Sequence, residues 1–262
     1  MKKELWYKEY HNDDFYISFR VEEHLFSGVS EYQKIDVFKN KFYGNILFLD
    51  GLLMITEKDE YFYHEAITHP AMGNAKSVCI IGGGDGGTLR EVLKYDVDEV
   101  YLVEIDKMVI EVSKRFFKKI SKSFEDKRVK IINKDGVDFI KKFNSFFDLI
   151  IIDSSEPLGP SKKLFKKEFY LEMKKKLNSK GKIVAQLGSY LYHKEFIKNF
   201  ISTLNSVFKT IVTYTLPTPT YPGGLWVYGI FSDSFSVSDV NIDREKTKYI
   251  NTELFKGSIV KL

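Results

Sequence analysis

The sequence has very little cysteine and no long apolar run. Its single cysteine, Cys79, cannot form an internal disulfide bond, which excludes a disulfide-stapled secreted fold and is compatible with a reducing compartment. No stretch approaches the roughly 18 apolar residues of a membrane span. The segment Met1–Trp6 turns acidic and aromatic at once, which is not typical of a signal peptide. We therefore expect a cytoplasmic protein with no membrane partner.

The chain also has little excess charge of either sign. It contains 40 Lys and Arg against 36 Asp and Glu in 262 residues, so the formal net charge is only +4. The basic residues are mostly lysines scattered along amphipathic stretches, which indicates solvated helix faces, and no nucleic acid partner is expected. Hydrophobic residues make up 44% and aromatic residues 15%, which excludes a disordered chain. The length suits one catalytic domain with a small appended one.

Residues 1–56 have the texture of β-structure. Apolar and polar side chains alternate from Phe15 to Val21, as in a half-buried strand. Asp50 and Gly51 form a hairpin signal between two further apolar stretches. The sequence therefore predicts a small antiparallel β-domain over residues 1–56.

After residue 56 the β-pattern ends, and from residue 77 strands and helices alternate. A helix is expected after Thr56, with Pro70 near its end. Beyond it, continuous apolar runs alternate with helical patterns, as in a parallel sheet covered on both faces. The predicted strands are 78–81, 100–103, 129–132, 149–152, 182–185, 209–215 and 225–231, and the predicted helices are 88–94, 107–117, 136–142, 161–178 and 193–207. Residues 57–262 are thus predicted to form an α/β catalytic domain whose ligands bind at the carboxyl ends of the strands.

A glycine-rich loop, residues 82–87, follows the first of these strands. Gly82, Gly84 and Gly87 have the dinucleotide spacing, which by itself suggests a dehydrogenase. Such a loop binds a pyrophosphate dianion through backbone N–H groups, and the carboxylate of Asp85 would repel that dianion. A phosphate-free, positively charged nucleoside such as a sulfonium fits better. The alternative is a tight strand–helix turn in which Asp85 caps the helix.

Two further strands end in carboxylates. Glu104 is placed to accept hydrogen bonds from a ribose diol, while Asp106 is expected to cap the next helix. Asp135, followed by Gly136, is placed either to accept from an adenine amine or to cap its own helix.

The fourth strand delivers Asp153 and Glu156 to the same edge of the sheet. Neither has an evident basic partner in the sequence. Unpaired carboxylates near a cleft destabilise the folded protein unless a cation binds there. The alternative is a simple loop cap. Together with the acids of the other strand ends, they predict an acidic pocket that would concentrate a polycation.

Taken together, these residues resemble those of the spermidine synthases, the polyamine aminopropyltransferases. Blocks that match this family occur in order over nearly the whole chain. They are Tyr32-Gln33-Lys34-Ile35, Leu49-Asp50-Gly51, Glu57-Lys58-Asp59-Glu60, Tyr63-His64-Glu65, the glycine loop, Val103-Glu104-Ile105-Asp106, Asp135-Gly136, Asp153-Ser154-Ser155-Glu156-Pro157 and Thr220-Tyr221-Pro222-Gly223-Gly224. A glycine loop alone is a weak signal, but this many blocks in register are specific.

The resemblance implies both a fold and a reaction. The fold is a Rossmann-like, class I methyltransferase-type parallel sheet flanked by helices and preceded by a small antiparallel β-domain, assembled as a homodimer or homotetramer. The reaction moves the aminopropyl group of decarboxylated S-adenosylmethionine to putrescine and gives spermidine and methylthioadenosine. The nucleoside is then a co-substrate, and neither a cofactor nor a metal is expected.

The resemblance also assigns site residues by position. The donor-binding residues it implies are Gln33, His64, Asp85, Glu104, Asp135, Gly136 and Pro160. The acceptor-binding residues it implies are Tyr63, Asp153, Ser154, Ser155, Glu156 and Tyr221. Putrescine arrives as a dication, since an alkyl ammonium has a pKa of about 10.4, so its attacking nitrogen must lose a proton. Asp153 is the expected general base.

Two departures from the family pattern leave the acceptor open. Glu156 stands where the family usually has Asp, and Met54 stands where Gln is common. The extra methylene of Glu156 moves its carboxylate, so cadaverine, agmatine or a triamine remains an alternative acceptor. A methyltransferase that uses intact S-adenosylmethionine is a further alternative, although the carboxylate of that donor would lie badly against Asp85.

Overall fold

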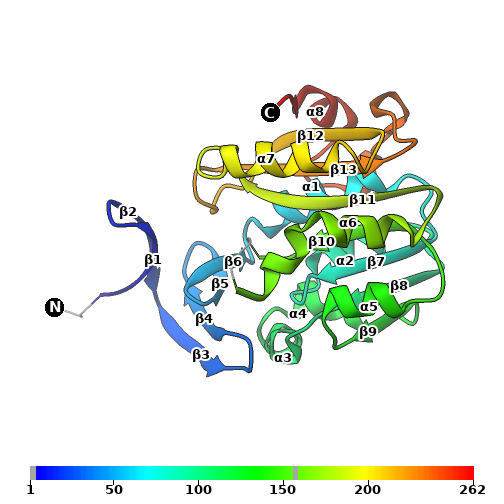
Figure 1. The fold of residues 1–262 in the computed structure, drawn as a ribbon. Helices are drawn as coiled ribbons and strands as arrows, with labels where there is room; N and C mark the ends of the chain where they lie inside the picture. Colours follow the sequence, from blue (N-terminus) through cyan, green and yellow to red (C-terminus); the bar gives the residue numbers. More distant parts are fainter. Residues whose placement is uncertain (1–3, 156–158) are drawn as a thin grey trace.

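The computed structural model describes residues 4–155 and 159–262 (Figure 1). The N-terminal part consists of two antiparallel sheets, as predicted. One pairs β1 (Leu5–Asn12) with β2 (Phe15–Val21), and the other has the order β3-β4-β5-β6. The strands of the second sheet are β3 (Glu23–Val29), β4 (Lys34–Asn40), β5 (Gly44–Leu49) and β6 (Leu52–Thr56). The predicted turn between β5 and β6 is present, because Asp50 and Gly51 both have positive φ, 48° and 85°.

The rest of the chain builds a mostly parallel sheet of eight strands, which confirms the predicted fold class. Its order is β14-β12-β13-β11-β10-β7-β8-β9. Strands β11, β10, β7, β8 and β9 run parallel, whereas β13, β12 and β14 join by antiparallel pairing. The strands are β7 (Ser77–Gly82), β8 (Glu99–Val103), β9 (Val129–Ile132), β10 (Phe147–Asp153), β11 (Leu177–Ser189), β12 (Thr210–Pro217), β13 (Leu225–Ser232) and β14 (Ile259–Val260).

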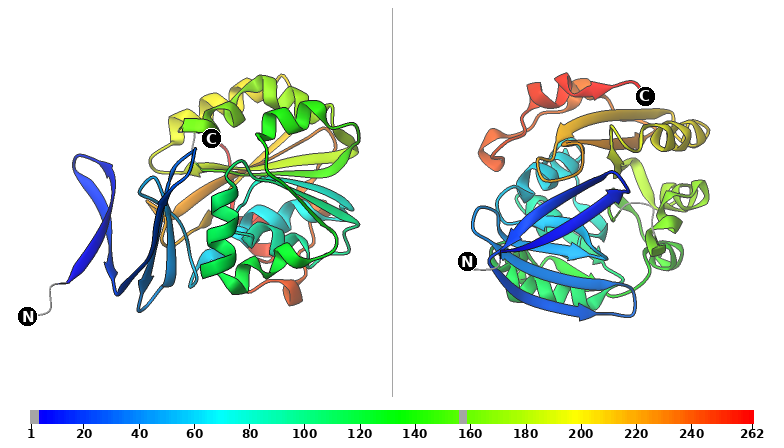
Figure 2. Two further views of the ribbon diagram at one scale, coloured as in Figure 1. Left: turned by 90° about the horizontal axis from the view of Figure 1, so that it is seen from below. Right: turned by 90° about the vertical axis from the view of Figure 1, so that its left-hand side faces the viewer.

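Helices cover both faces of this sheet (Figures 1 and 2). They are α1 (Glu60–Met72), α2 (Gly87–Val92), α3 (Lys107–Phe116), α4 (Lys118–Ser121), α5 (Gly136–Lys142), α6 (Lys167–Lys174), α7 (Lys194–Leu204) and α8 (Thr252–Gly257), with short 3₁₀ turns η1 (Lys122–Glu125), η2 (Gly159–Phe165), η3 (Val237–Asp239) and η4 (Arg244–Lys246). Among the described residues, none of these helices is both long and apolar enough to cross a bilayer.

The continuous apolar runs are explained by burial on both faces of the sheet. Leu149 and Ile151 of β10 belong to a core cluster with residues of α1 and α2. The intervening Ile150 and Ile152 belong to a second cluster with residues of α5, α6 and α7. Because successive side chains of a strand point to opposite faces, a strand between two helical layers must be apolar at every position.

Helix α3 connects the N-terminal sheet to the large one. Its residues Val109 and Val112 are buried in a cluster with Ile35, Leu47 and Ile55 of the β3–β6 sheet. Figure 2 shows the N-terminal strands beside the large sheet, with hairpin β1–β2 outermost. The carboxyl ends of β7, β8 and β10 therefore open toward the β3–β6 sheet, and the space between them contains the site.

One predicted element is wrong. The sequence predicted a single helix over 161–178, but η2 ends at Phe165, α6 covers only Lys167–Lys174, and β11 begins at Leu177. Lys166 has extended backbone angles (φ −98°, ψ 140°), which separate the two helical segments. The backbone N–H of Phe147 donates to the carbonyl of Lys176 at 2.8 Å, which draws the following residues into the sheet beside β10.

Candidate active site

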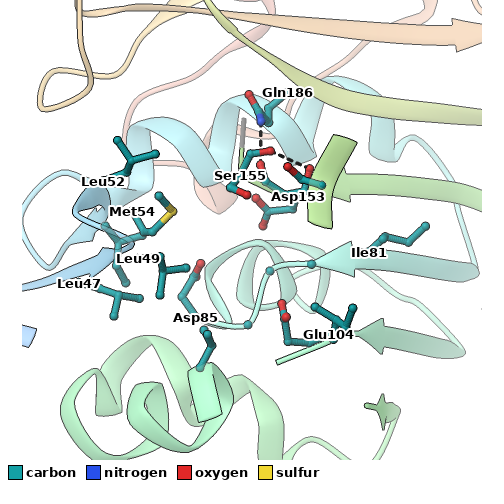
Figure 3. Close-up of a pocket in the computed structure, with 18 of the residues that line it drawn as sticks. Leu47, Leu49, Leu52, Met54, Ile81, Asp85, Glu104, Asp153, Ser155 and Gln186 are labelled. Atoms are coloured by element: carbon teal, nitrogen blue, oxygen red, sulfur yellow. Dashed lines mark hydrogen bonds between the residues drawn. The ribbon is translucent and has the colours of Figure 1, made fainter. Parts of the chain in front are cut away.

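A single pocket collects residues from both parts of the chain. Figure 3 shows Leu47, Leu49, Leu52 and Met54 on one side of it, and Glu104 and Asp153 on the other. The predicted site residues that line it are Gln33, Tyr63, His64, Asp85, Glu104, Asp135, Gly136, Asp153, Ser154, Ser155 and Tyr221. Glu156 lies outside the described residues, and of Pro160 only the backbone is described, within η2.

The glycine loop is shaped by close contact with the end of β10. A Cβ on Gly82 would lie 2.0 Å from the backbone oxygen of Asp153, and that oxygen accepts a hydrogen bond from the N–H of Gly83 at 2.8 Å. Gly82, Gly83 and Gly86 have positive φ, between 67° and 89°. Asp85 accepts a hydrogen bond from the N–H of Gly87 at 2.6 Å, but the N-cap residue of α2 is Gly86. Asp85 therefore supports the turn without being the helix cap that the alternative expected.

Asp153 ends β10 inside the pocket and is only 8% exposed. The hydroxyl of Tyr63 donates to Oδ1 at 2.7 Å, whereas Oδ2 makes no hydrogen bond to the residues that the structure describes. Burial and the charge of Asp85 raise the pKa of Asp153 above its ordinary value. A carboxylate with a raised pKa and one unused oxygen is suited to accept a proton.

His64 is fully buried and carries the positive charge of the site. Its Nε2 lies 3.2 Å from Oδ1 of Asp85, and its Nδ1 lies 2.6 Å from Oε2 of Glu60. Burial works against protonation, but Asp85 and Glu60 raise the pKa of His64 to about 10. Burial likewise opposes ionisation of Asp85, but His64 lowers the pKa of that carboxyl below its usual value. Asp85 therefore already faces a cation within the pocket.

Glu104, at the end of β8, is buried beside the glycine loop. Its Oε1 accepts a hydrogen bond from the N–H of Asp106 at 2.8 Å. Burial, together with the charges of Asp106 and Asp153, raises the pKa of Glu104 to about 7. Asp106 caps α3, as predicted, because its side chain accepts from the N–H of Met108 at 3.0 Å, and it also accepts from Nε2 of Gln33 at 2.9 Å.

Asp135 likewise has the geometry of a helix cap. Its Oδ1 accepts from the N–H of Val137 at 2.7 Å, at the start of α5. Its Oδ2 lies 3.3 Å from Nζ of Lys163, another pocket-lining residue. The next residue, Gly136, lies close to β7, since a Cβ there would be 2.5 Å from Cγ2 of Ile81.

Aromatic side chains form the other end of the pocket. The hydroxyl of Tyr221 donates to the backbone oxygen of Met54, and its ring lies 5.7 Å from that of Tyr63 and 4.8 Å from that of Trp226. Nε1 of Trp226 donates to Gln186, whose Nε2 donates in turn to the backbone oxygen of Ser154 at 2.7 Å (Figure 3). This chain of contacts supports the segment that follows Asp153.

Sequence reasoning missed several of these residues. Glu60 and His64 are four residues apart on one helix, which is a usable local signal, but Arg90 contacts Glu60 from another helix and leaves no such signal. Gln186 and Glu9 also line the pocket, and no local sequence pattern indicates them. Glu9 reaches the pocket from β1 and is 2% exposed.

His64, Asp85 and Asp153 each offer one ligand atom within 4.8 Å of the others, a spacing that could hold a metal ion. A histidine binds metals as neutral imidazole, however, and the raised pKa of His64 keeps this ring protonated near neutral pH. Metal binding here would therefore have to displace the proton that Asp85 and Glu60 favour on His64.

Comparison with known protein families gives two matches in sequence order. The sequence model of the spermidine synthase tetramerisation domain matches residues 5–57, and that of the spermine/spermidine synthase domain matches residues 60–241.

Individual relatives match over almost the full length. The polyamine aminopropyltransferase of Alkaliphilus metalliredigens is 44% identical over 97% of this chain and 94% of its own, and that of Thermoplasma volcanium is 41% identical with the same coverage. A crystal structure of spermidine synthase in complex with the transition state analogue AdoDATO is 37% identical and superposes with a TM-score of 0.93, covering 98% of this chain and 92% of that one. The spermidine synthase of Thermotoga maritima has a TM-score of 0.90 at 36% identity, covering 98% and 91%. The chain therefore belongs to the spermine/spermidine synthase family and is an enzyme of the polyamine aminopropyltransferase type.

Proposed function

We propose that this enzyme transfers the aminopropyl group of decarboxylated S-adenosylmethionine to putrescine, giving spermidine and methylthioadenosine. The observation that carries the proposal is Asp153, buried at the end of β10 with Tyr63 on one oxygen and the other oxygen free of hydrogen bonds to described residues. The glycine loop with Asp85 lies directly beside it, so a cationic nucleoside and an amine would meet at this carboxylate.

The donor would lie along the carboxyl ends of β7, β8 and β9. Glu104 would accept hydrogen bonds from the ribose diol, which favour its charged form and would lower its raised pKa. Asp85 would face the aminopropyl ammonium of the donor. The residues proposed to bind the donor are Gln33, His64, Asp85, Glu104, Asp135, Gly136 and Pro160.

The acceptor would enter beside the aromatic end of the pocket. The residues proposed to bind it are Tyr63, Asp153, Ser154, Ser155, Glu156 and Tyr221. The rings of Tyr63, Tyr221 and Trp226 supply an apolar surface for the methylene chain, since they lie within contact of one another.

The chemistry is a displacement at the carbon next to the sulfonium. Asp153 takes one proton from the attacking ammonium, and the freed lone pair forms the new N–C bond. The C–S bond breaks, and its electron pair returns to sulfur, which leaves as the neutral thioether of methylthioadenosine. Holding nitrogen, carbon and sulfur in line supplies much of the acceleration, because the step becomes effectively unimolecular.

Other amines remain alternative acceptors within the same chemistry. Glu156 sits where the family usually has Asp, and cadaverine, agmatine or a triamine would each place a second cation at a different distance from Asp153. The decisive experiment incubates the purified enzyme with decarboxylated donor and a panel of these amines, and identifies the products by mass. Intact S-adenosylmethionine is the matched control; alkylation of no amine, or methyl transfer from the intact donor alone, would refute the proposal.

The chain organisation is part of the proposal. We propose a division into residues 1–56 and 57–262, supported by the end of β6 at Thr56 and the start of α1 at Glu60. Assembly as a homotetramer, with a homodimer as the alternative, is supported by the match of residues 5–57 to the tetramerisation domain. A cytoplasmic location is supported by the single, buried Cys79, which suits a reducing compartment.

A further inference from the structure

Two charged residues, the buried Glu60 and the partly buried Arg90, lie behind His64, outside the residues that line the pocket. Glu60 is on α1, one turn before His64, and Arg90 is on α2. We infer that Glu60 and Arg90 are positioning residues that hold His64 as a fixed cation between Asp85 and Asp153, so that both carboxylates stay ionised for catalysis. This inference rests on the proposed function.

The contact between Glu60 and Arg90 has two parallel hydrogen bonds. Nη1 of Arg90 donates to Oε1 of Glu60 at 2.7 Å, and Nη2 donates to Oε2 at 2.8 Å. The same Oε2 accepts from Nδ1 of His64 at 2.6 Å. A two-point contact of this kind restrains the plane of the carboxylate, and the carboxylate in turn restrains the imidazole.

The opposite side of the His64 ring is equally restricted. A Cβ on Gly87 would lie 2.1 Å from Cε1 of His64, so the ring occupies space that a side chain would otherwise fill. The ring of Tyr63 meets it edge-on, with centroids 5.3 Å apart. Glu60 is bound at Nδ1, and Nε2 lies 3.2 Å from Oδ1 of Asp85. The imidazole is therefore packed against Gly87 and Tyr63 and lies between the carboxylates of Glu60 and Asp85.

The charges explain what this position achieves. Two carboxylates as close as Asp85 and Asp153 in a buried site tend to share one proton, which would remove the base. A cation between them favours the ionised form of both. The groups that face His64 are Glu60 and Tyr63 of α1, Asp85 of the glycine loop and Asp153 of β10, with Arg90 of α2 behind Glu60.

Glu60 and Arg90 maintain that cation together. Burial alone would raise the pKa of Glu60, but His64 and Arg90 lower it to about 2, so this carboxylate is ionised over the working range. Its charge, with that of Asp85, keeps His64 protonated. Loss of the charge on Glu60 would therefore release the proton of His64 and let Asp85 and Asp153 share one instead.

The test is the variant Glu60→Gln, which keeps the shape of the side chain and removes its charge. We expect the acidic limb of the pH profile of kcat/KM for the amine to move upward by about one pH unit. Histidine NMR of the ligand-free enzyme should show His64 titrating near neutral pH in the variant, but protonated to about pH 9 in the unaltered enzyme. Arg90→Lys keeps one donor and its charge, so its pH profile should shift less.

Glu65→Gln is the matched control. Glu65 is also buried on α1, but its carboxylate accepts from the backbone N–H groups of residues 248–250 instead of from the His64 ring. The Glu65→Gln variant should be less stable, but its kcat/KM pH profile and the titration of His64 should be unchanged. If Glu60→Gln does not fold, Arg90→Met gives the same test from α2. A pH profile and a His64 titration unchanged in the folded variants would overturn the inference, and the NMR titration decides it even if no aminopropyl transfer is found.

Discussion

At the scale of single residues, each site carboxylate differs from the others in its surroundings. Asp85 is paired with a cation, Glu104 is buried beside other acids, and Asp153 shares a hydrogen bond with a tyrosine. These surroundings move the pKa of Asp85 down and those of Glu104 and Asp153 up. Within one pocket, the surroundings thus favour the ionised form of Asp85 and the protonated forms of Glu104 and Asp153.

Replacement of the proposed base tests the role of Asp153. Asp153→Asn keeps the hydrogen bond from Tyr63 within reach but removes the proton acceptor, so we expect kcat to fall by about 100-fold to 10,000-fold. The thermal midpoint should change little, because the unpaired carboxylate is costly to bury. Asp138→Asn, on the exposed face of α5, is the control and should be fully active. Normal turnover in Asp153→Asn would exclude this residue as the base.

The raised pKa of Glu104 makes a prediction about stability. With a folded pKa of about 7 against an ordinary value of 4.5, the ligand-free folded state binds the proton more tightly than the unfolded chain. The free energy of unfolding should therefore decrease as pH rises from about 5 to 7, by up to about 3 kcal/mol for this group. Glu104→Gln removes this term, so its thermal midpoint relative to the unaltered enzyme should be higher at pH 8 than at pH 5.

Thermal unfolding at the two pH values measures this difference. Glu111→Gln, an exposed position on α3, is the control and should show the same relative midpoint at both. A relative midpoint of Glu104→Gln that does not depend on pH would show that Glu104 titrates normally in the folded enzyme.

At the scale of elements, one buried aspartate connects the start of α1 to the segment that carries Tyr221. Oδ2 of Asp59 accepts from the backbone N–H of Thr220 at 3.1 Å and from its hydroxyl at 2.8 Å. Oδ1 accepts from Thr56 at 2.6 Å. The position of Tyr221 over the pocket therefore depends on a residue outside it.

Asp59→Ala should loosen this connection without touching the pocket. We expect KM for the amine to rise about tenfold while kcat falls less. The free energy of unfolding should drop by about 2 kcal/mol, because three buried donors lose their acceptor. Steady-state kinetics and chemical denaturation measure the two effects. Thr220→Ser retains the hydroxyl and should behave like the unaltered enzyme; equal losses in both kinetic constants would speak against a role in positioning Tyr221.

The elements also show what a single sequence can predict. The central strands were predicted because burial between two helical layers leaves only apolar residues, as in β10. The same apolar pattern predicts where the strands end, and therefore predicts that Glu104 and Asp153 lie at the edge of the sheet. Contacts between distant segments are not predicted in this way: the pairing of Arg90 with Glu60, and the break at Lys166, depend on tertiary structure that no local pattern records.

At the scale of the whole molecule, the N-terminal sheets expose large apolar side chains. Leu5, Trp6, Tyr10, Val29 and Phe42 are each about half or more exposed. Apolar surface of this kind on a small β-unit is typical of a subunit interface. It is consistent with the proposed tetramer.

A charge placed in this surface should separate the subunits. Combining Trp6→Glu with Val29→Glu is expected to lower the mass in solution from that of a tetramer toward the 30.5 kDa of one chain, because the interface would have to bury unpaired charge. Light scattering coupled to size-exclusion chromatography gives the mass. Phe146→Glu, at an exposed apolar position in the loop before β10, is the control; a variant mass equal to that of the unaltered protein would place the interface elsewhere.

Asp153 belongs to two structures at once. Its carboxylate lies in the pocket, while its backbone pairs with Gly82 in the ladder of β7 and β10 and accepts from the N–H of Gly83. Because these backbones are hydrogen-bonded to each other, we expect motion of this edge of the sheet to move the carboxylate of Asp153 and the glycine loop together. The proposed displacement depends only on the relative positions of the attacking nitrogen, the carbon and the sulfur. Motion that both segments share would leave these relative positions unchanged. This edge of the sheet can therefore move while Asp153 and the glycine loop keep their relative positions.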